Sequence, residues 1–152
     1  MSTTSSYPDS LARTSAATVQ ELLARFWMQL VPLADLLVRS EHLLCAQTLM
    51  QARATVLEMM LALNGVAYPE GTRHLNTYLG ASQRAAIERT LLLPAVSNEA
   101  WIGQAVALTV IYRWYAPQLE AAYAVTHPET AEATALAVLQ TLPDWPLAIT
   151  TD

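Results

Sequence analysis

Apolar residues recur at helical spacing along almost the whole chain. From Thr18 onward they fall three or four positions apart, as in amphipathic helices. No alternating pattern typical of a strand continues for more than a few residues, and nearly all glycines and prolines stand where helices should end. The pattern therefore predicts an all-α fold, an up-and-down helical bundle of four to five principal helices.

Prolines, glycines and capping residues set the expected helix boundaries. Pro32 should bend the first helix, Asn64-Gly65 should close the second as a left-handed cap, and Ser97-Asn98 should begin a long helix in which Pro117 is a candidate kink. The expected ranges are about 18–39, 40–63, 73–79, 82–93, 98–125 and 128–142. We expect a flexible N-terminal segment over residues 1–14, rich in Ser and Thr, and one helical domain over 15–152.

The helix expected over 40–63 carries a wide apolar face. Its central stripe is Cys45, Leu49, Ala52, Val56, Met59 and Leu63, and its polar side is Glu41, Thr48, Gln51, Thr55 and Glu58. Arg53 interrupts the apolar face. Either its side chain snorkels or pairs with a buried carboxylate, or it binds an anion or an acidic group of a partner.

The long helix after Asn98 is apolar on all sides, which is typical of a central helix or an interface. Its aromatic residues, Trp101, Tyr112, Trp114, Tyr115 and Tyr123, are expected mainly in the core. Arg113 is its one basic residue, for which a paired structural role is favoured. If Arg53 and Arg113 converge, they would form a small phosphate or carboxylate site.

Composition narrows the classes of partner. Hydrophobic residues make up 53% of the 152 residues and charged residues only 14%, which favours a surface that is partly covered by something else. The net charge is −5, and the eight basic residues, all Arg, form no basic stripe, so nucleic acid is not expected as the main partner. The longest uncharged stretch, 100–112, is too short for a membrane span.

Chemical motifs are scarce in this sequence. Cys45 is the single cysteine and the chain starts without a basic, apolar leader, so we expect a cytoplasmic protein. Neither a glycine-rich nucleotide loop nor Glu-x-x-His occurs, and the three histidines and one cysteine lack metal-ligand spacing. We therefore expect no catalytic residues, no metal and no cofactor in this chain alone.

Two consecutive segments resemble a known helical domain. The first matches "FW…(K)-x-L-x-R-G-E…A" at Phe26-Trp27, Arg39, Glu41 and Ala46, with Ser40 in place of Gly and Ala34-Asp35 where Lys is common. The second matches "L-N-x-x-Y-x-P-(G)-x-K-x-L" at Leu63, Asn64, Tyr68, Pro69, Gly71, Arg73 in place of Lys, and Leu75. Together, over about 25–94, they resemble the helical substrate-binding (HEPN-like) domain of the nucleotidyltransferase superfamily, as in the C-terminal domain of antibiotic nucleotidyltransferases.

The resemblance implies an up-and-down bundle and a division of labour. The catalytic half of that family carries Gly-Ser followed by Asp-x-Asp, whose carboxylates hold Mg²⁺ at the nucleotide phosphates. This sequence contains neither motif. The resemblance therefore implies a non-catalytic helical domain that pairs with a separate nucleotidyltransferase chain or with itself and lines a substrate cleft.

Within that interpretation the candidate substrate-binding residues divide by charge. Glu41 and Glu58 would suit a cationic small-molecule ligand, whereas Arg39, Arg53 and Arg73 would suit an anionic one. Two alternatives stay open. One is a structural or regulatory interaction bundle, such as a homodimer, with no small-molecule site. The other is a helical enzyme or ligand binder of an unrecognised type.

Overall fold

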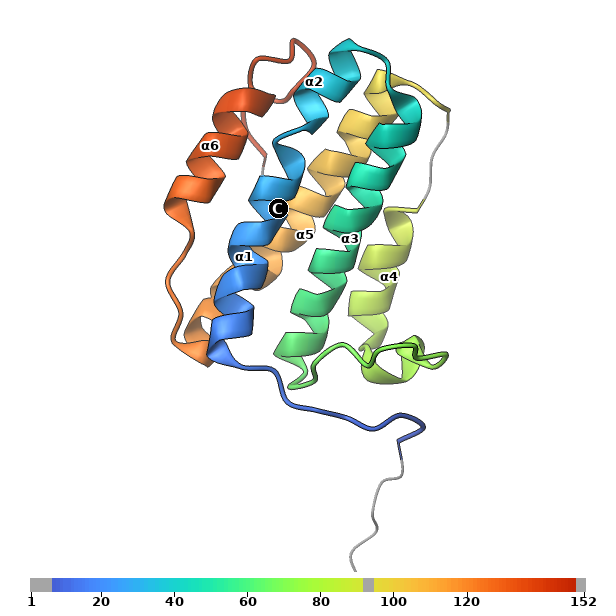
Figure 1. Ribbon diagram of the computed structural model, residues 1–152, viewed down its shortest axis with the longest axis vertical. Helices are drawn as coiled ribbons and strands as arrows, with labels where there is room; N and C mark the ends of the chain where they lie inside the picture. Colours follow the sequence, from blue (N-terminus) through green and yellow to red (C-terminus); the bar gives the residue numbers. More distant parts are fainter. Residues whose placement is uncertain (1–6, 92–94, 150–152) are drawn as a thin grey trace, which may run out of the picture.

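A computed structural model describes residues 7–91 and 95–149, and Figure 1 shows an all-helical bundle without strands over these residues. The elements are α1 (Ala16–Leu30), α2 (Leu33–Val38), α3 (His42–Leu63), a 3₁₀ helix η1 (Leu75–Tyr78), α4 (Ala81–Arg89), α5 (Asn98–Tyr123) and α6 (Glu129–Leu139). The predicted all-α fold is confirmed. Within these residues no helix has both the length and the apolar character that crossing a membrane requires.

Successive helices from α1 through α3, α4, α5 and α6 alternate in direction, as an up-and-down bundle requires, so α3 and α5 run in the same direction (Figure 1). Central in this arrangement is α3, which packs against both α1 and α5. On one side α6 covers α1, and on the other α4 lies against α3 and α5. The molecule thus has a three-helix centre with one shorter helix on each flank.

Proline acts differently at its two helical positions. The helix expected over 18–39 is in fact two helices, α1 and α2, separated at Val31-Pro32, because proline lacks the backbone N–H and its ring clashes with the preceding turn. By contrast, α5 continues through Pro117, whose side chain is exposed. Pro117 therefore does not end α5, and the kink expected there stays a prediction.

The expected caps of the two central helices are present. Gly65 has φ +81°, and the N–H groups of Gly65 and Val66 donate to the carbonyls of Ala62 and Leu61, both at 2.9 Å. This is the Schellman arrangement that glycine favours after a helix. At the start of α5 the Ser97 hydroxyl accepts a hydrogen bond from the Ala100 N–H at 3.2 Å.

Other boundaries differ from the sequence-based ranges. The helix expected over 73–79 is only the 3₁₀ turn η1, α4 ends at Arg89, and α6 ends at Leu139. The expected stop at Pro94 lies outside the described residues. Thr55, expected on the polar side of its helix, is only 2% exposed because α1 packs there, and its hydroxyl donates to Gln29 Oε1 at 2.8 Å.

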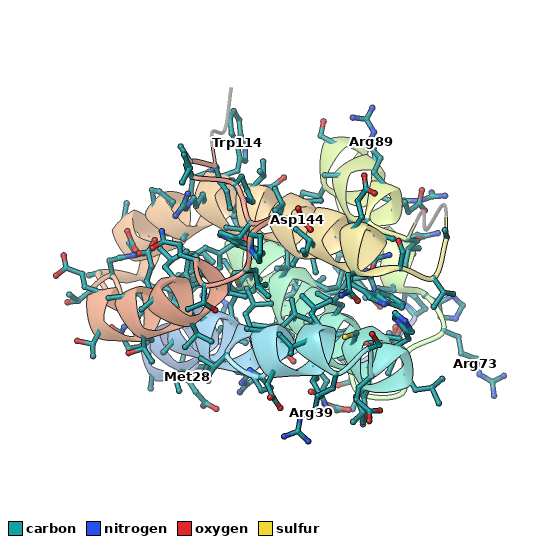
Figure 2. All side chains as sticks on the ribbon, turned by 90° about the horizontal axis from the view of Figure 1, so that it is seen from above. Met28, Arg39, Arg73, Arg89, Trp114 and Asp144 are labelled. Carbon is teal, nitrogen blue, oxygen red and sulfur yellow. The ribbon has the colours of Figure 1, made fainter. Side chains whose placement is uncertain are left out.

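Aromatic rings fill the centre of the bundle. Phe26 stacks on Tyr112 at 4.4 Å between ring centroids, and Trp27 meets both rings edge-on. The Tyr112 hydroxyl donates to the Leu23 carbonyl at 2.9 Å, and burial raises the pKa of Tyr112 strongly. Trp114 is the exception to the expected aromatic core, because its side chain is 58% exposed (Figure 2).

Residues 7–14 follow the end of the bundle near η1. The Thr72 and Tyr78 hydroxyls donate to Asp9 Oδ2 at 2.6 and 2.7 Å, and the Ala67 N–H donates to the Ala12 carbonyl at 2.9 Å. These bonds tie part of the N-terminal segment to the loop that follows α3.

Candidate functional site

Arg53 lies midway along α3, on the side that faces α4 and α5. Its Nε donates to Thr90 Oγ1 at 2.8 Å, and its Nη2 donates to the Thr90 carbonyl at 2.9 Å and, at 3.4 Å, to Gln104 Oε1. Across residues 7–91 and 95–149 no carboxylate lies within ion-pairing distance of Arg53. The cation is therefore held by neutral oxygens alone.

The position of Thr90 explains why this arrangement is tolerated. Thr90 is the C-cap of α4, where helix carbonyls lack intrahelical donors and carry the negative end of the helix dipole. Burial nevertheless lowers the pKa of the half-buried Arg53, although a guanidinium remains protonated in proteins. The cation thus carries a desolvation cost that a neighbouring anion would reduce.

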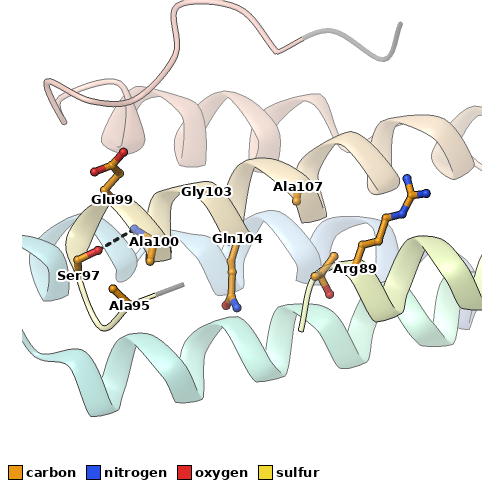
Figure 3. A pocket seen from close by; sticks show the side chains of 9 residues that line it. Arg89, Ala95, Ser97, Glu99, Ala100, Gly103, Gln104 and Ala107 are labelled. Carbon is orange, nitrogen blue, oxygen red and sulfur yellow. Dashed lines mark hydrogen bonds between the residues drawn. The ribbon is translucent and has the colours of Figure 1, made fainter. Parts of the chain in front are cut away.

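Two open pockets flank Arg53. The larger, which we call the polar pocket, has a volume of about 560 Å³ and lies between the end of α4 and the first half of α5 (Figure 3). Its lining includes both acceptors of Arg53, Thr90 and Gln104, together with Arg89, Ser97 and Glu99. The smaller, which we call the apolar groove, measures about 290 Å³, lies between α3 and α4, and includes Arg53 itself.

Most of the residues around Arg53 were not among the candidates predicted from the sequence. Arg84 and Arg89 line the groove and the pocket respectively, but neither interrupts an apolar face. An Arg84–Glu88 pair four positions apart was visible in the sequence and marks an exposed side of α4. For Thr90 and Gln104 no local signal exists, because only the packing of α4 and α5 brings them to Arg53.

Arg113 is bound by partners within the chain and does not lie near Arg53. Its Nη2 lies 3.3 Å from Glu132 Oε1, its Nη1 donates to the Ile149 carbonyl at 3.1 Å, and its guanidinium lies 5.9 Å from the Trp27 ring centroid. Arg113 follows Gln104 by nine positions on α5, which places the two on opposite faces of the helix. The two arginines therefore form no shared anion site.

His127 shares the carboxylate of Glu132 with Arg113. Its Nδ1 lies 2.6 Å from Glu120 Oε1, and its Nε2 pairs with Glu132. Burial lowers the pKa of His127, but the hydrogen bonds and charges of Glu132 and Glu120 outweigh it, so the pKa is raised. The two carboxylates sit at opposite ring nitrogens, and no group of His, Cys, Asp and Glu within the described residues could hold a metal ion.

The remaining candidates are separate from Arg53. Arg39 pairs with Asp35 at 3.2 Å, and both it and Arg73 project outward from the bundle (Figure 2). Glu41 is exposed at the start of α3. Glu58 lies 3.7 Å from an Arg25 nitrogen, and burial raises its pKa.

Arg53 therefore stands apart among the six candidates: it is half-buried, has no carboxylate partner in the part of the chain described, and adjoins two pockets. Comparison with known protein families, curated protein sequences and solved structures gives no match for this chain.

Proposed function

We propose that this chain is a non-catalytic helical accessory domain that binds the anionic part of a substrate at Arg53 and pairs with a nucleotidyltransferase-type catalytic chain. The observation that carries the binding role is the half-buried guanidinium, which among the described residues is held by neutral oxygens only and which adjoins two open pockets. A carboxylate or phosphate is the natural ligand for such a group.

Two features support the pairing role. The up-and-down bundle agrees with the fold that the family resemblance implies, and the printed sequence contains neither Gly-Ser nor Asp-x-Asp. In this proposal the carboxylates that hold Mg²⁺ come from the partner chain. A cytoplasmic location remains part of the same proposal.

A homodimeric interaction bundle is the second candidate, and exposed apolar side chains favour it. The large hydrophobic residues that are most exposed on the helices are Val38, Leu43, Met50 and Trp114. Such residues suit either a second copy of this chain or a different partner. Light scattering on the purified chain tests this alternative, because a strict monomer would argue against a homodimeric bundle.

The decisive experiment is a nucleotide-transfer assay with Mg²⁺ and ATP. We expect no transfer from the purified chain alone, and transfer when it is co-expressed with a chain encoded beside it that carries Gly-Ser followed by Asp-x-Asp. Arg53→Met should then lower transfer in the pair, while the control Arg13→Met, at an exposed site outside both pockets, should not. Robust transfer by this chain alone would contradict the non-catalytic role.

A further inference from the structure

The apolar groove is a hydrophobic trough with one strong polar feature. Residues of α3, η1 and α4 form its walls, and its main apolar lining is Met50, Leu57, Leu75, Leu79, Ile87 and Leu91. Met50 is 60% exposed and Leu91 61%, so apolar surface is left open to water. Covering this surface with an apolar group would be favourable by the hydrophobic effect.

The charged residues that line the groove include one more cation than anion. Its charged lining residues are Arg53, Arg84 and Glu88, and Arg84 Nε already donates to Glu88 Oε1 at 2.8 Å. Arg53 is the group without a carboxylate partner in the described structure, and none of the described residues accepts a hydrogen bond from its Nη1. The groove thus carries one net positive charge in a chain whose net charge is −5.

We propose that the apolar groove binds a small amphipathic monocarboxylate, with its carboxylate on Arg53 and its apolar body along the α3 and α4 walls. This inference rests on the proposed function, because Arg53 is the anion-binding residue there, and it adds the class of substrate. A carboxylate on the guanidinium relieves the cost of burying an unpaired cation, while the apolar body covers exposed hydrophobic surface.

Size and charge both restrict the ligand. A volume of about 290 Å³ lies at the lower end of ligand pockets, which suits an alkyl chain of roughly eight carbons or a single aromatic ring. A phosphate dianion would bring a second negative charge close to Glu88, whereas a monocarboxylate balances the one excess charge. Neutral and cationic analogues would leave Arg53 without a counter-charge.

Isothermal titration calorimetry of the purified chain with octanoate tests this inference. We expect saturable one-to-one binding that is at least about tenfold tighter than binding of octanol or octyl phosphate. Octylammonium should not bind. Each methylene added from butanoate to octanoate should tighten binding by about four-fold, since each one buries apolar area in the groove.

Three variants separate the charge from the apolar walls. Arg53→Gln removes the guanidinium, and Ala54→Phe fills the groove from an exposed position of α3 while leaving Arg53 in place. Both should weaken octanoate binding at least about tenfold. Arg13→Gln makes the same charge change at an exposed site outside the groove and the polar pocket, and it should bind as the wild type does. Circular dichroism verifies that each variant is folded. If Arg53→Gln does not fold, Ala54→Phe still tests binding in the groove.

Three results would overturn the inference: no octanoate binding, equal binding by octanol, or unchanged binding in both Arg53→Gln and Ala54→Phe. Its failure is distinguishable from failure of the proposed function. Transfer by the chain alone would refute the accessory role without touching octanoate affinity. Absence of octanoate binding beside a functional catalytic pair would refute only the ligand class.

Discussion

Arg53 and Arg113 are both arginines on largely apolar central helices, and their surroundings solve the same electrostatic problem differently. Arg113 pairs with the carboxylate of Glu132. Its guanidinium also contacts the carbonyl of Ile149 and the ring of Trp27. Arg53 has neutral oxygens and two open pockets. The protein supplies the counter-charge of Arg113 itself, whereas the described residues supply none for Arg53, and for this reason we propose Arg53 and not Arg113 as the anion-binding residue.

Helix lengths create this asymmetry. On the Arg113 side, Glu132 of α6 and the carbonyl of Ile149, in the chain that follows α6, both reach the guanidinium. On the Arg53 side, α4 has only nine residues and ends at the level of Thr90, while α3 and α5 have 22 and 26. A short helix between two long ones leaves the polar pocket beyond its end.

The largest contrast should come from apolar truncation on the two sides. Trp27→Ala removes a fully buried indole that packs edge-on against Phe26 and Tyr112, and we expect it to lower the free energy of unfolding by about 3–5 kcal/mol. Met50→Ala, in the open groove, should change it by less than about 0.5 kcal/mol. Urea denaturation measures both, and a comparable loss in the two variants would mean that the groove is closed in solution.

The second contrast removes each charge at roughly constant volume. Arg113→Met leaves Glu132, which is 21% exposed, with only His127 as a cationic partner among the described residues. The change should cost about 2 kcal/mol, less than breaking a fully buried pair, because both groups are partly solvated and His127 still pairs with Glu132. Arg53→Met loses hydrogen bonds to Thr90 and Gln104 but also a desolvated charge, so its net cost should stay below about 1 kcal/mol.

A double-mutant cycle identifies the cause of the Arg113 effect. In the presence of Glu132→Gln, the cost of Arg113→Met should fall to about half, because the abandoned carboxylate is gone. Additive losses would show that Arg113 acts through Trp27 and Ile149 instead. A severe loss in Arg53→Met would in turn argue for a purely structural role of that residue.

Local sequence signals were enough to predict most of the helical framework. Pro32, Gly65 and Ser97 act on their own backbone, so a helix break or cap can be inferred without knowing what packs nearby. The errors arose where packing decides. Thr55 is buried by α1, and the segment before Tyr78 makes only a 3₁₀ turn.

The candidate site was predictable only in its central residue. Arg53 stood out because a cation interrupts an apolar helical face, and that signal is local. Its partners Thr90 and Gln104 lie 37 and 51 positions later in the sequence, in other parts of the fold. The same limit explains why the sequence alone could not decide whether Arg53 and Arg113 converge, since the answer depends on which helices cover each face of α5.

A smaller effect should appear with pH on the Arg113 side. The pKa of His127 is raised above its ordinary value of 6.5, so its stabilising contribution is complete below about pH 6.5 and is lost as the pH rises through the folded-state pKa. The urea midpoint of the wild type should therefore fall above about pH 6.5 more steeply than that of His127→Gln. Glu120→Gln should move the fall to lower pH, since it removes one anion that raises the pKa. Parallel profiles for wild type and His127→Gln would refute the linkage.

Arg39 gives the smallest expected effect and sets the baseline for both arginines. Its pair with Asp35 lies on α2 and the following cap, with both side chains about two-thirds exposed, at 68% and 67%. Exposed pairs of this kind gain little because water and salt screen them, so Arg39→Gln should change the free energy of unfolding by less than about 0.5 kcal/mol. The change should shrink further when the denaturation is repeated at about 1 M salt. A salt-resistant loss of stability close to that of Arg113→Met would show that solvent exposure does not determine how much these arginines contribute. The contrast between Arg53 and Arg113 would then need another cause than the presence of a carboxylate.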